Sequence, residues 1–439
     1  MVDNKQRYKA YPEYKNSNLT WMGDIPKDWE QKKFKWIFEE KKKVSNLKLP
    51  AGSISFGNVV YKNEENLSPD TKASYQEVLK GEFLINPLNL NFDLKSLRTA
   101  LSEIDVVVST GYIVLKYSGS FNKNYLRWLL YEFDVAHMKK LGSGVRQTIN
   151  YTDIGNSLFF HPTIKEQGKI ANFLDYETAK IDTLIEKQQH LIELLTEKRQ
   201  AVISHAVTKG LNPDVPMKDS GIEWLGEVPA HWIVAQLKFN TISMQTGPFG
   251  SQLHAEEYVE NGIPLINPAH LINGNIVPDL SVTVDLDTQE RLSRHKLSKG
   301  DIVFARRGEL GRCAIVKESQ EGWLCGTGSL RGTLNEKLLP EYAYLLITSK
   351  GVISELSLES KGSTMDNLNT ETLGRVRLPV PPITEQDDII LYVENVSGKY
   401  EQLISKAEQA IQLMQERRTA LISAAVTGKI DVRDWVKPS

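Results

Sequence analysis

Two polar, glycine-bearing segments in the second half of the chain carry side chains suited to binding DNA. Gln245-Thr-Gly-Pro-Phe-Gly-Ser-Gln252 offers short side chains and backbone amides that can approach a phosphate closely. Arg306-Arg-Gly-Glu-Leu-Gly-Arg312 places three guanidinium groups around a turn, and arginine both reads guanine and clamps phosphates. With the polar stretch 361–367, these segments predict DNA contacts by Thr246, Gly247, Phe249, Gly250, Ser251, Gln252, Arg306, Arg307, Gly308, Arg312, Ser363, Thr364 and Asn367.

The first half of the chain holds a second, less definite set of candidates. Lys32 and Lys33 lie in a basic stretch interleaved with Phe34 and Trp36, and three more lysines follow at 41–43. The segment 142–148 matches 361–367 in position, and its arginine and glutamine are base-reading types. The candidates in this half are therefore Lys32, Lys33, Lys62, Arg98, Ser143, Gly144, Arg146 and Gln147. For each loop taken alone, a solvated turn remains the alternative.

Residue patterns that would indicate catalysis are missing from the sequence. Asn86-Pro-Leu88 and Asn267-Pro-Ala269 resemble the start of an amino-methyltransferase motif, but both lack its second proline and its aromatic residue. No glycine pattern typical of a nucleotide-binding loop is present. Cys313 and Cys325 lack the spacing of metal ligands. Glu82 and Asp301 fit turns before strands better than a catalytic pair. We therefore predict no catalytic residue, no metal site and no bound cofactor.

The chain contains two copies of one unit. Residues 197–208 (EKRQAVISHAVT) return as 416–427 (ERRTALISAAVT), 219 positions later. An earlier echo, WMGDIPKDW at 21–29, returns as WLGEVPAHW at 224–232, 203 positions later. Each copy has a strand-rich front and a proline-free back. We expect strands at 106–108, 112–117, 301–304 and 313–316, and short helices at 124–132 and 341–348.

The back of each copy predicts one long helix, over 166–207 and over 385–426. Apolar residues recur there at spacings of three and four, which favours a heptad-like seam between the two helices. About 40 residues make a rod of roughly 60 Å. Exposed apolar stripes are unstable in water, so we expect the helices to pack antiparallel, with one globular head at each end. The predicted seam comprises Ile181, Leu184, Leu191, Leu195, Val202, Tyr400, Leu403, Met414 and Leu421.

Composition sets broad limits on these hypotheses. The 439 residues are 41% hydrophobic and 25% charged, with a formal net charge of −2, so overall charge gives no sign of nucleic-acid binding. No apolar run is long enough to span a membrane, and the first residues lack a signal-peptide core. Together with only two cysteines, this favours a soluble protein of the reducing cytoplasm.

Taken in order, these motifs resemble the specificity subunit of type I restriction–modification enzymes. The resemblance covers essentially the whole chain, although the first half lacks the Gly-Pro-Phe-Gly-Ser loop and the Arg-Arg-Gly turn. Its carriers are Trp21–Trp29, Trp224–Trp232, Gly247–Ser251, Gly300–Gly308 with Gly311, Lys361–Met365, Pro162–Gln167 and Pro381–Gln386.

The resemblance implies an α+β fold, with two mixed α/β target recognition domains joined by two antiparallel spacer helices in a pseudo-two-fold repeat. The implied domains are 1–160, 161–212, 213–379 and 380–439. Each recognition domain would read one half of a bipartite, asymmetric DNA site. The helices would set the gap and dock two methyltransferase subunits. S-adenosylmethionine, ATP and Mg²⁺ would be bound by the methyltransferase and motor-nuclease subunits.

Two other classes of protein remain open at this point. A coiled-coil scaffold that binds no DNA would need no basic loops in its heads. A self-contained DNA methyltransferase or nuclease would need a cofactor fold or a catalytic motif.

Overall fold

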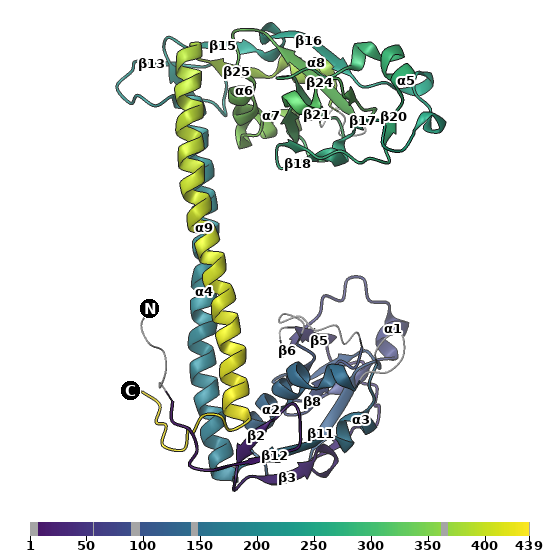
Figure 1. Ribbon diagram of the computed structural model, residues 1–439, viewed down its shortest axis with the longest axis vertical. Coiled ribbons are helices and arrows are strands. Elements are labelled where there is room, and N and C mark those ends of the chain that lie inside the picture. Colours follow the sequence, from purple (N-terminus) through teal and green to yellow (C-terminus); the bar gives the residue numbers. More distant parts are fainter. Residues whose placement is uncertain (1–7, 56, 89–96, 142–147, 361–367, 439) are drawn as a thin grey trace. The chain divides into compact units, whose positions relative to one another are not determined.

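The chain is mixed α/β and folds into two compact units. The computed structural model describes residues 8–55, 57–88, 97–141, 148–360 and 368–438. Unit 1 contains residues 1–190 and 407–439, and unit 2 contains residues 191–406. Two long helices, α4 (Ile164–Lys209) and α9 (Ile383–Val426), each pass from one unit into the other (Figure 1).

The head of unit 1 is built on a six-stranded mixed sheet, in which residues alternate between two cores. Phe83 and Ile85 face the core that includes α2 (Lys123–Ala136), whereas Leu84 faces a smaller core on the other side. This is the period-two pattern of a strand covered on both faces. The strands, in spatial order, are β4 (Phe38–Glu40), β11 (Ile113–Tyr117), β8 (Phe83–Ile85), β9 (Thr99–Leu101), β6 (Asn58–Tyr61) and β5 (Gly52–Ser55).

Shorter pairs of strands and helices complete unit 1. β3 (Glu30–Lys33) pairs with β12 (Leu158–His161), which leads directly into α4. The other elements are β1 (Tyr14–Asn16) paired with β2 (Asp24–Pro26), β7 (Gln76–Val78) paired with β10 (Val106–Val108), α1 (Pro69–Ala73), α3 (Tyr151–Asn156) and the short 3₁₀ helices η1 (Phe34–Trp36) and η2 (Met138–Lys140).

The head of unit 2 shows the same alternation in its central strand. Ile302 and Phe304 of β21 (Ile302–Ala305) face one core, and Val303 and Ala305 face another. The sheet has the order β16 (Thr241–Thr246), β24 (Ser329–Leu334), β21 and β22 (Cys313–Ile315). β15 (Ile233–Gln236) pairs with β25 (Arg377–Val380), which leads into α9.

Unit 2 has further elements outside this sheet. They include β13 (Met217–Asp219), β14 (Glu227–Pro229), β17 (Ile263–Ile266), β18 (Leu271–Ile272), β19 (Asn275–Ile276), β20 (Thr283–Val284), β23 (Leu324–Cys325), α5 (Leu286–Arg291), α6 (Pro340–Ile347), α7 (Lys350–Ser360), α8 (Thr370–Arg375) and the 3₁₀ helix η3 (Leu237–Asn240). The strands and short helices expected from the sequence match β10, β11, β21, β22, α2 and α6 within a few residues.

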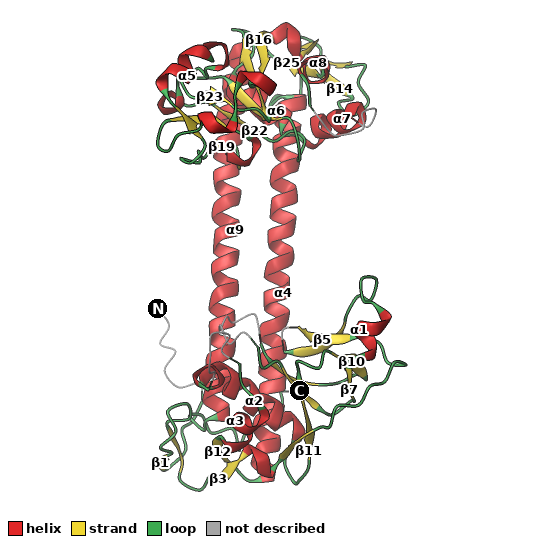
Figure 2. Cartoon of the chain, turned by 90° about the vertical axis from the view of Figure 1, so that its right-hand side faces the viewer, coloured by secondary structure: helices red, strands yellow, loops and turns green. Residues whose placement is uncertain are grey.

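The two long helices lie side by side within each unit (Figure 2). In unit 1, Ile181 near the start of α4 shares a core with Leu421 and Ile422 near the end of α9. In unit 2, Ala206 and Val207 of α4 share a core with Ile389 and Val393 of α9. The start of one helix therefore meets the end of the other, so the helices run antiparallel. Glycine ends α9: Gly428 has φ +71°, and a Cβ there would overlap Pro26.

The predicted seam is wrong at three positions. Leu184, Leu191 and Leu403 are 50%, 41% and 49% exposed. The positions that turn inward are instead Ile185, Ile192 and Ile404, one residue further along. Both choices satisfy spacings of three or four, so the sequence pattern could not separate two neighbouring apolar stripes. The structure buries or half-buries the remaining predicted positions Ile181, Leu195, Val202, Tyr400, Met414 and Leu421.

An ion pair joins the two helices in each unit. In unit 1, the Arg418 guanidinium Nε lies 2.9 Å from the Asp182 carboxylate. In unit 2, the Arg199 Nη1 lies 3.4 Å from the Glu401 carboxylate. The two arginines are separated by 219 positions, as are the two acids. The same pair of repeat positions is thus used once in each unit.

Each head is fixed to the start of its long helix by a Glu-Gln pair. In unit 1, Glu166 accepts hydrogen bonds from Trp29 Nε1 (3.2 Å) and Tyr11 Oη (2.6 Å). In unit 2, Glu385 accepts one from Trp232 Nε1 (2.9 Å) and lies 2.7 Å from His231 Nε2. These contacts give a structural role to the Trp and Glu positions of the repeated motifs.

The glutamines that follow are buried and connect the long helix to a second helix of the head. Gln167 donates to the Pro162 carbonyl (3.0 Å) and accepts from the Asn122 amide (3.0 Å) at the start of α2. Gln386 donates to the carbonyls of Pro381 (2.9 Å) and Lys337 (2.8 Å), and accepts from the Leu339 amide (2.9 Å) at the start of α6. The direction of each long helix is therefore set relative to its own head.

Candidate nucleic-acid interface

Head 2, the part of unit 2 outside the long helices, carries a cavity of about 490 Å³ lined by polar side chains and one aromatic ring. Its lining residues are Thr246, Phe249, Arg306, Arg307, Thr327 and Gly328. Three neighbouring strands explain why they meet. Thr246 ends β16, the two arginines follow β21, and Thr327 and Gly328 precede β24, which lies between the other two strands. Four of the predicted residues therefore lie together at one end of these strands: Thr246, Phe249, Arg306 and Arg307.

Thr327 and Gly328 are lining residues that the sequence reasoning missed. They belong to Gly326-Thr-Gly-Ser329, which is polar and glycine-rich like the loops 245–252 and 306–312. This composition could have identified the turn from the sequence. What the sequence could not supply was the strand order that places this turn between the other two loops.

Close backbone packing holds the Phe249 loop in place. The Gly247 amide donates to the Ser329 carbonyl (3.0 Å), and a Cβ on Gly247 would overlap the carbonyl oxygen of Gly326. The Phe249 amide donates to the Gln252 side-chain oxygen (3.1 Å). Gln252 therefore closes the loop from within, and Phe249 stays 60% exposed.

The three arginines of the 306–312 turn differ in their partners. Arg306 donates from Nε to the Leu368 carbonyl (3.2 Å) and from its amide to the Gly328 carbonyl (3.0 Å), so its side chain is partly fixed. Arg307 is exposed and makes no hydrogen bond or ion pair within the described part of the chain. Arg312 buries its Nε atom, which has no hydrogen-bond partner among the described residues. Arg307 is therefore the guanidinium most available to a ligand.

A neutral histidine lies beneath the surface of head 2. His295 is 1% exposed, and burial, followed by the charges of Arg294 and Arg331, lowers its pKa. An uncharged imidazole there adds nothing to the positive potential of the cavity. Among the residues that line the cavity, Arg306 and Arg307 carry the positive charge.

One candidate in head 1, the part of unit 1 outside the long helices, is contradicted by the structure. Arg98 is 4% exposed, and its Nη1 lies 3.3 Å from Asp134 Oδ1, while its backbone amide donates to the same carboxylate (2.7 Å). Arg98 immediately precedes β9, and its side chain points inward to Asp134 on α2. Arg98 therefore supports the core instead of facing DNA. Burial raises the pKa of Asp134 despite the neighbouring guanidinium.

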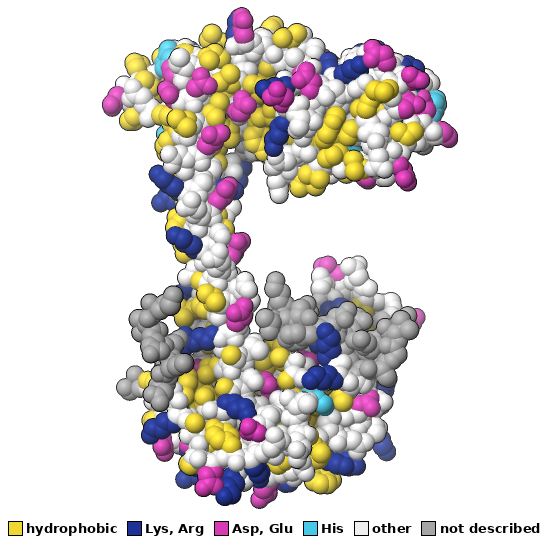
Figure 3. Space-filling model, viewed as in Figure 1, with side chains coloured by type: hydrophobic (Ala, Val, Ile, Leu, Met, Phe, Trp, Pro, Cys, Tyr) yellow, Lys and Arg dark blue, Asp and Glu magenta, His cyan; other side chains and the backbone are white. Residues whose placement is uncertain are grey.

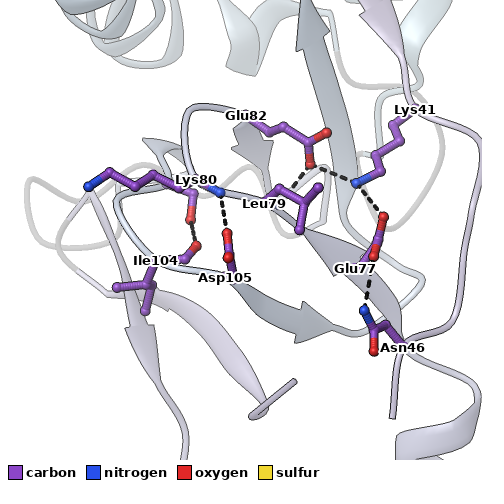
Figure 4. Close-up of polar contacts among 9 residues, drawn as sticks. Lys41, Asn46, Glu77, Leu79, Lys80, Glu82, Ile104 and Asp105 are labelled. Atoms are coloured by element: carbon purple, nitrogen blue, oxygen red, sulfur yellow. Dashed lines mark hydrogen bonds and ion pairs between the residues drawn. The ribbon is translucent and has the colours of Figure 1, made fainter. Parts of the chain in front are cut away.

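The first lysine of the basic stretch 41–43 has a structural role in head 1. Figure 4 shows the Lys41 ammonium between Glu77 (3.1 Å) and Glu82 (2.8 Å), and all three are largely buried. The hydrogen bond from Lys41 keeps the pKa of Glu77 below its usual value. Glu82 also accepts from the Leu79 amide (2.8 Å), as Asp301 accepts from the Ser298 amide (2.8 Å) in unit 2. Both acids close turns before strands, as the sequence analysis predicted.

The other candidates of head 1 lie on separate elements. Lys32 and Lys33 are half-buried on β3, and the Lys32 ammonium lies 5.1 Å from the centre of the Phe121 ring. Lys62 is exposed just after β6. Ser143, Gly144, Arg146 and Gln147 of head 1, and Ser363, Thr364 and Asn367 of head 2, lie outside the described residues.

Acidic and basic side chains are interspersed over both units in the view of Figure 3, so the face shown there carries no single basic patch. In the described part of the chain, no group of three or more histidine, cysteine or acidic residues could hold a metal ion. No helix within the same ranges is both long and apolar enough to cross a membrane.

A family model for the type I restriction modification DNA specificity domain matches residues 246–412. The match begins at the Thr246 cavity loop and extends into α9. The chain carries a type I restriction–modification specificity domain. The resemblance identified from the repeated motifs is thereby confirmed.

Similar proteins agree with this assignment. The MjaVIII specificity subunit of Methanocaldococcus jannaschii is 24% identical over 278 residues, which cover 62% of both chains. A putative MjaX specificity subunit of the same organism is 23% identical over 447 residues, covering 96% of this chain and 98% of the relative. The chain spans only 62% and 57% of the first two curated relatives it matches.

A solved structure shows the same fold. It comes from work on complex assembly and conformational transition of the type I restriction–modification system, and it matches with a TM-score of 0.64 over 92% of this chain and 98% of that one. Sequence identity is 13%, so this likeness concerns the fold alone.

Proposed function

We propose that this chain is the sequence-specific DNA-binding subunit of a type I restriction–modification complex. The observation that carries the proposal is the match to the specificity domain, which starts at the arginine-lined cavity of head 2. Arginine side chains beside threonine hydroxyls are suited to base edges and phosphates. Thr246, Phe249 and Arg307 are the side chains on which recognition by head 2 depends.

Each head reads one half of a bipartite, asymmetric site in double-stranded DNA. Support comes from equivalent hydrogen bonds that attach each head to its long helix, between Trp29 and Glu166 and between Trp232 and Glu385. The exposed loops of the heads differ in sequence, whereas these attachments are the same. A common frame with different reading surfaces suits two different half-sites on one duplex. The corresponding domains are 1–160 and 213–379, with spacer segments 161–212 and 380–439.

The chain itself is non-catalytic and binds no cofactor. Methylation would use S-adenosylmethionine on two methyltransferase subunits, and translocation and cleavage would use ATP and Mg²⁺ on motor-nuclease subunits. The complex would act in the cytoplasm, where its DNA target lies.

The outward leucines of the long helices are the proposed docking points for the methyltransferase subunits. Leu184 and Leu413 in unit 1 are 50% and 65% exposed, and the matched residues Leu403 and Leu194 in unit 2 are 49% and 48% exposed. Each member of one pair is 219 positions from its counterpart in the other. Two equivalent pairs of exposed leucines fit two copies of one partner.

The docking proposal predicts a change in stoichiometry. The double variant Leu184→Asp, Leu413→Asp should remove the docking point of unit 1 alone, because a buried unpaired carboxylate disfavours an interface. Mass measurement of the purified complex should then give one methyltransferase per chain in place of two. Thr183→Asp, on a neighbouring exposed position, is the control. Two bound methyltransferases in the double variant would contradict the assignment of these leucines.

The experiment that tests the function as a whole is single-molecule methylation profiling of host DNA with and without this gene. We expect a split motif, two short blocks around a fixed gap, that disappears on deletion and returns with the intact gene. A host in which the expressed, assembled complex leaves no such motif would contradict the proposed function.

A further inference from the structure

The exposure of Phe249 has no explanation in the fold of unit 2. A large aromatic side chain gains stability by leaving water, yet this one remains 60% exposed. Phe249 is absent from the apolar clusters formed by the described residues. Its ring lines the cavity instead.

Close packing and hydrogen bonds also fix the backbone of the loop that carries Phe249. Gly247 packs so closely on Gly326 that a side chain there would overlap its carbonyl, and Gln252 closes the loop through its bond to the Phe249 amide. The Gln252 amide returns a bond to the Phe249 carbonyl (3.3 Å). The backbone that carries Phe249 is therefore fixed while its ring remains exposed at the cavity, as a preformed contact for a ligand would require.

The neighbours of Phe249 narrow the chemistry of that ligand. Among the six lining residues it is the one large apolar side chain, and the others offer guanidinium, hydroxyl and backbone groups. The major-groove edges of DNA offer hydrogen-bonding groups and one apolar group, the C5 methyl of thymine. Arg307, with its guanidinium unengaged by described residues, is suited to guanine.

We propose that Phe249 reads the methyl group of a thymine in the half-site of head 2, close to a guanine bound by Arg307. This inference rests on the proposed function and deepens it, because it names the base chemistry that one cavity selects. The half-site of head 2 then contains both a guanine and a thymine whose replacement by uracil weakens binding.

The test begins with selection of a random duplex library by the full chain, in the complex in which it purifies. A duplex from the selected consensus is then compared with one in which deoxyuridine replaces thymine in the head 2 half-site, which removes only methyl groups. We expect the wild type to bind the deoxyuridine duplex about four-fold more weakly, the effect of one buried methyl group. Phe249→Ala should bind the thymine duplex roughly ten-fold more weakly and should no longer distinguish the two duplexes.

Two controls separate the possible failures. Phe239→Ala removes a ring of similar exposure, 65% exposed on η3, and should leave discrimination between the two duplexes unchanged. Deoxyuridine placed in the other half-site should affect wild type and Phe249→Ala equally. Wild-type binding with no thymine preference, or a preference that survives in Phe249→Ala, overturns this inference while leaving the proposed function standing. A wild-type complex that selects no sequence overturns the proposed function, and this inference with it.

Discussion

At the scale of single residues, the role of an arginine in this chain depends on its neighbours. Arg98 and Arg307 were both candidates for DNA contact on the basis of residue type. Arg98 is buried against Asp134, whereas Arg307 is exposed at the cavity of head 2. Substitution of Arg98 should therefore affect the stability of unit 1, whereas substitution of Arg307 should affect DNA binding.

Arg98→Ala should destabilise unit 1 by about 3 kcal/mol, because it leaves the Asp134 carboxyl buried without the guanidinium that pairs with it. The raised pKa of Asp134 lets protonation relieve part of this cost, so the loss should shrink toward low pH. Arg307→Ala should leave thermal unfolding unchanged and weaken binding of the head 2 half-site by about 1–3 kcal/mol. Unfolding scans and binding titrations of both variants check this, and a reversed pattern would remove Arg307 from the interface.

A second residue-scale feature is the buried carboxyl of Glu132 on α2. Its Oε1 lies 2.8 Å from Ser423 Oγ of α9, and its Oε2 is buried with no hydrogen-bond partner among the described residues. Burial raises the pKa of Glu132 to about 7, and the Ser423 hydroxyl offsets only part of that rise. Head 1 therefore contacts the end of α9 through a group that is protonated in mildly acidic solution.

Glu132 should make the stability of unit 1 fall as pH rises. Folded protein holds this proton up to about pH 7 and the unfolded chain only to about 4.5, so stability is lost between these values, by at most about 3 kcal/mol. Glu132→Gln should remove this dependence and raise the melting temperature at pH 8. Glu77→Gln, whose carboxylate is paired with Lys41, should give no gain there. Equal melting of wild type and Glu132→Gln at pH 8 would mean that the carboxyl is hydrated.

At the scale of elements, the start of each long helix is the joint that positions its head. Gln386 is fully buried and makes three hydrogen bonds between α9, β25 and the start of α6. A glutamine suits this place because its amide donates and accepts at once. Gln167 does the same for α4 and α2 in unit 1.

Gln386→Ala should leave the Leu339 amide and two carbonyls unsatisfied and destabilise the joint by about 1–3 kcal/mol. Hydrogen exchange should increase at the starts of α6 and α9 before it increases elsewhere in unit 2. Gln402→Ala, on the exposed face of α9, is the matched control. Unchanged exchange in Gln386→Ala would show that packing alone fixes the head.

Helices and strands could be predicted from the sequence more accurately than tertiary contacts between side chains. Long helices, short strands and the loops of head 2 follow from local patterns, and these agree with the structure. The inward stripe of the helices was misplaced by one residue at Leu184, because Leu184 and Ile185 both fit a helical period. The pairing of Arg98 with Asp134 joins residues 36 apart, and Thr327 reaches the cavity only through strand order. Such long-range contacts leave no periodic signal in one sequence.

At the scale of the whole molecule, the proposed function requires a rigid helical spacer, because the spacer sets the gap between the two half-sites. The heads are fastened to helix starts through Gln167 and Gln386, and ion pairs join the helices at Arg199 and Arg418. Such a spacer should resist both stretching and twisting. One added base pair moves a half-site by about 3.4 Å and turns it by roughly a tenth of a helical turn.

Changing the gap of the selected site by one base pair should therefore prevent both heads from binding at once. Affinity should fall by about 100-fold or more, toward that of one head alone, because the advantage of joined sites is lost when geometry forbids simultaneous contact. Competition between duplexes with gaps one shorter, unchanged and one longer measures this directly. Scrambling either half-site at the original gap gives the one-head reference. Duplexes that bind equally at all three gaps would indicate a flexible link between the heads, and the long helices would then serve assembly and not measurement.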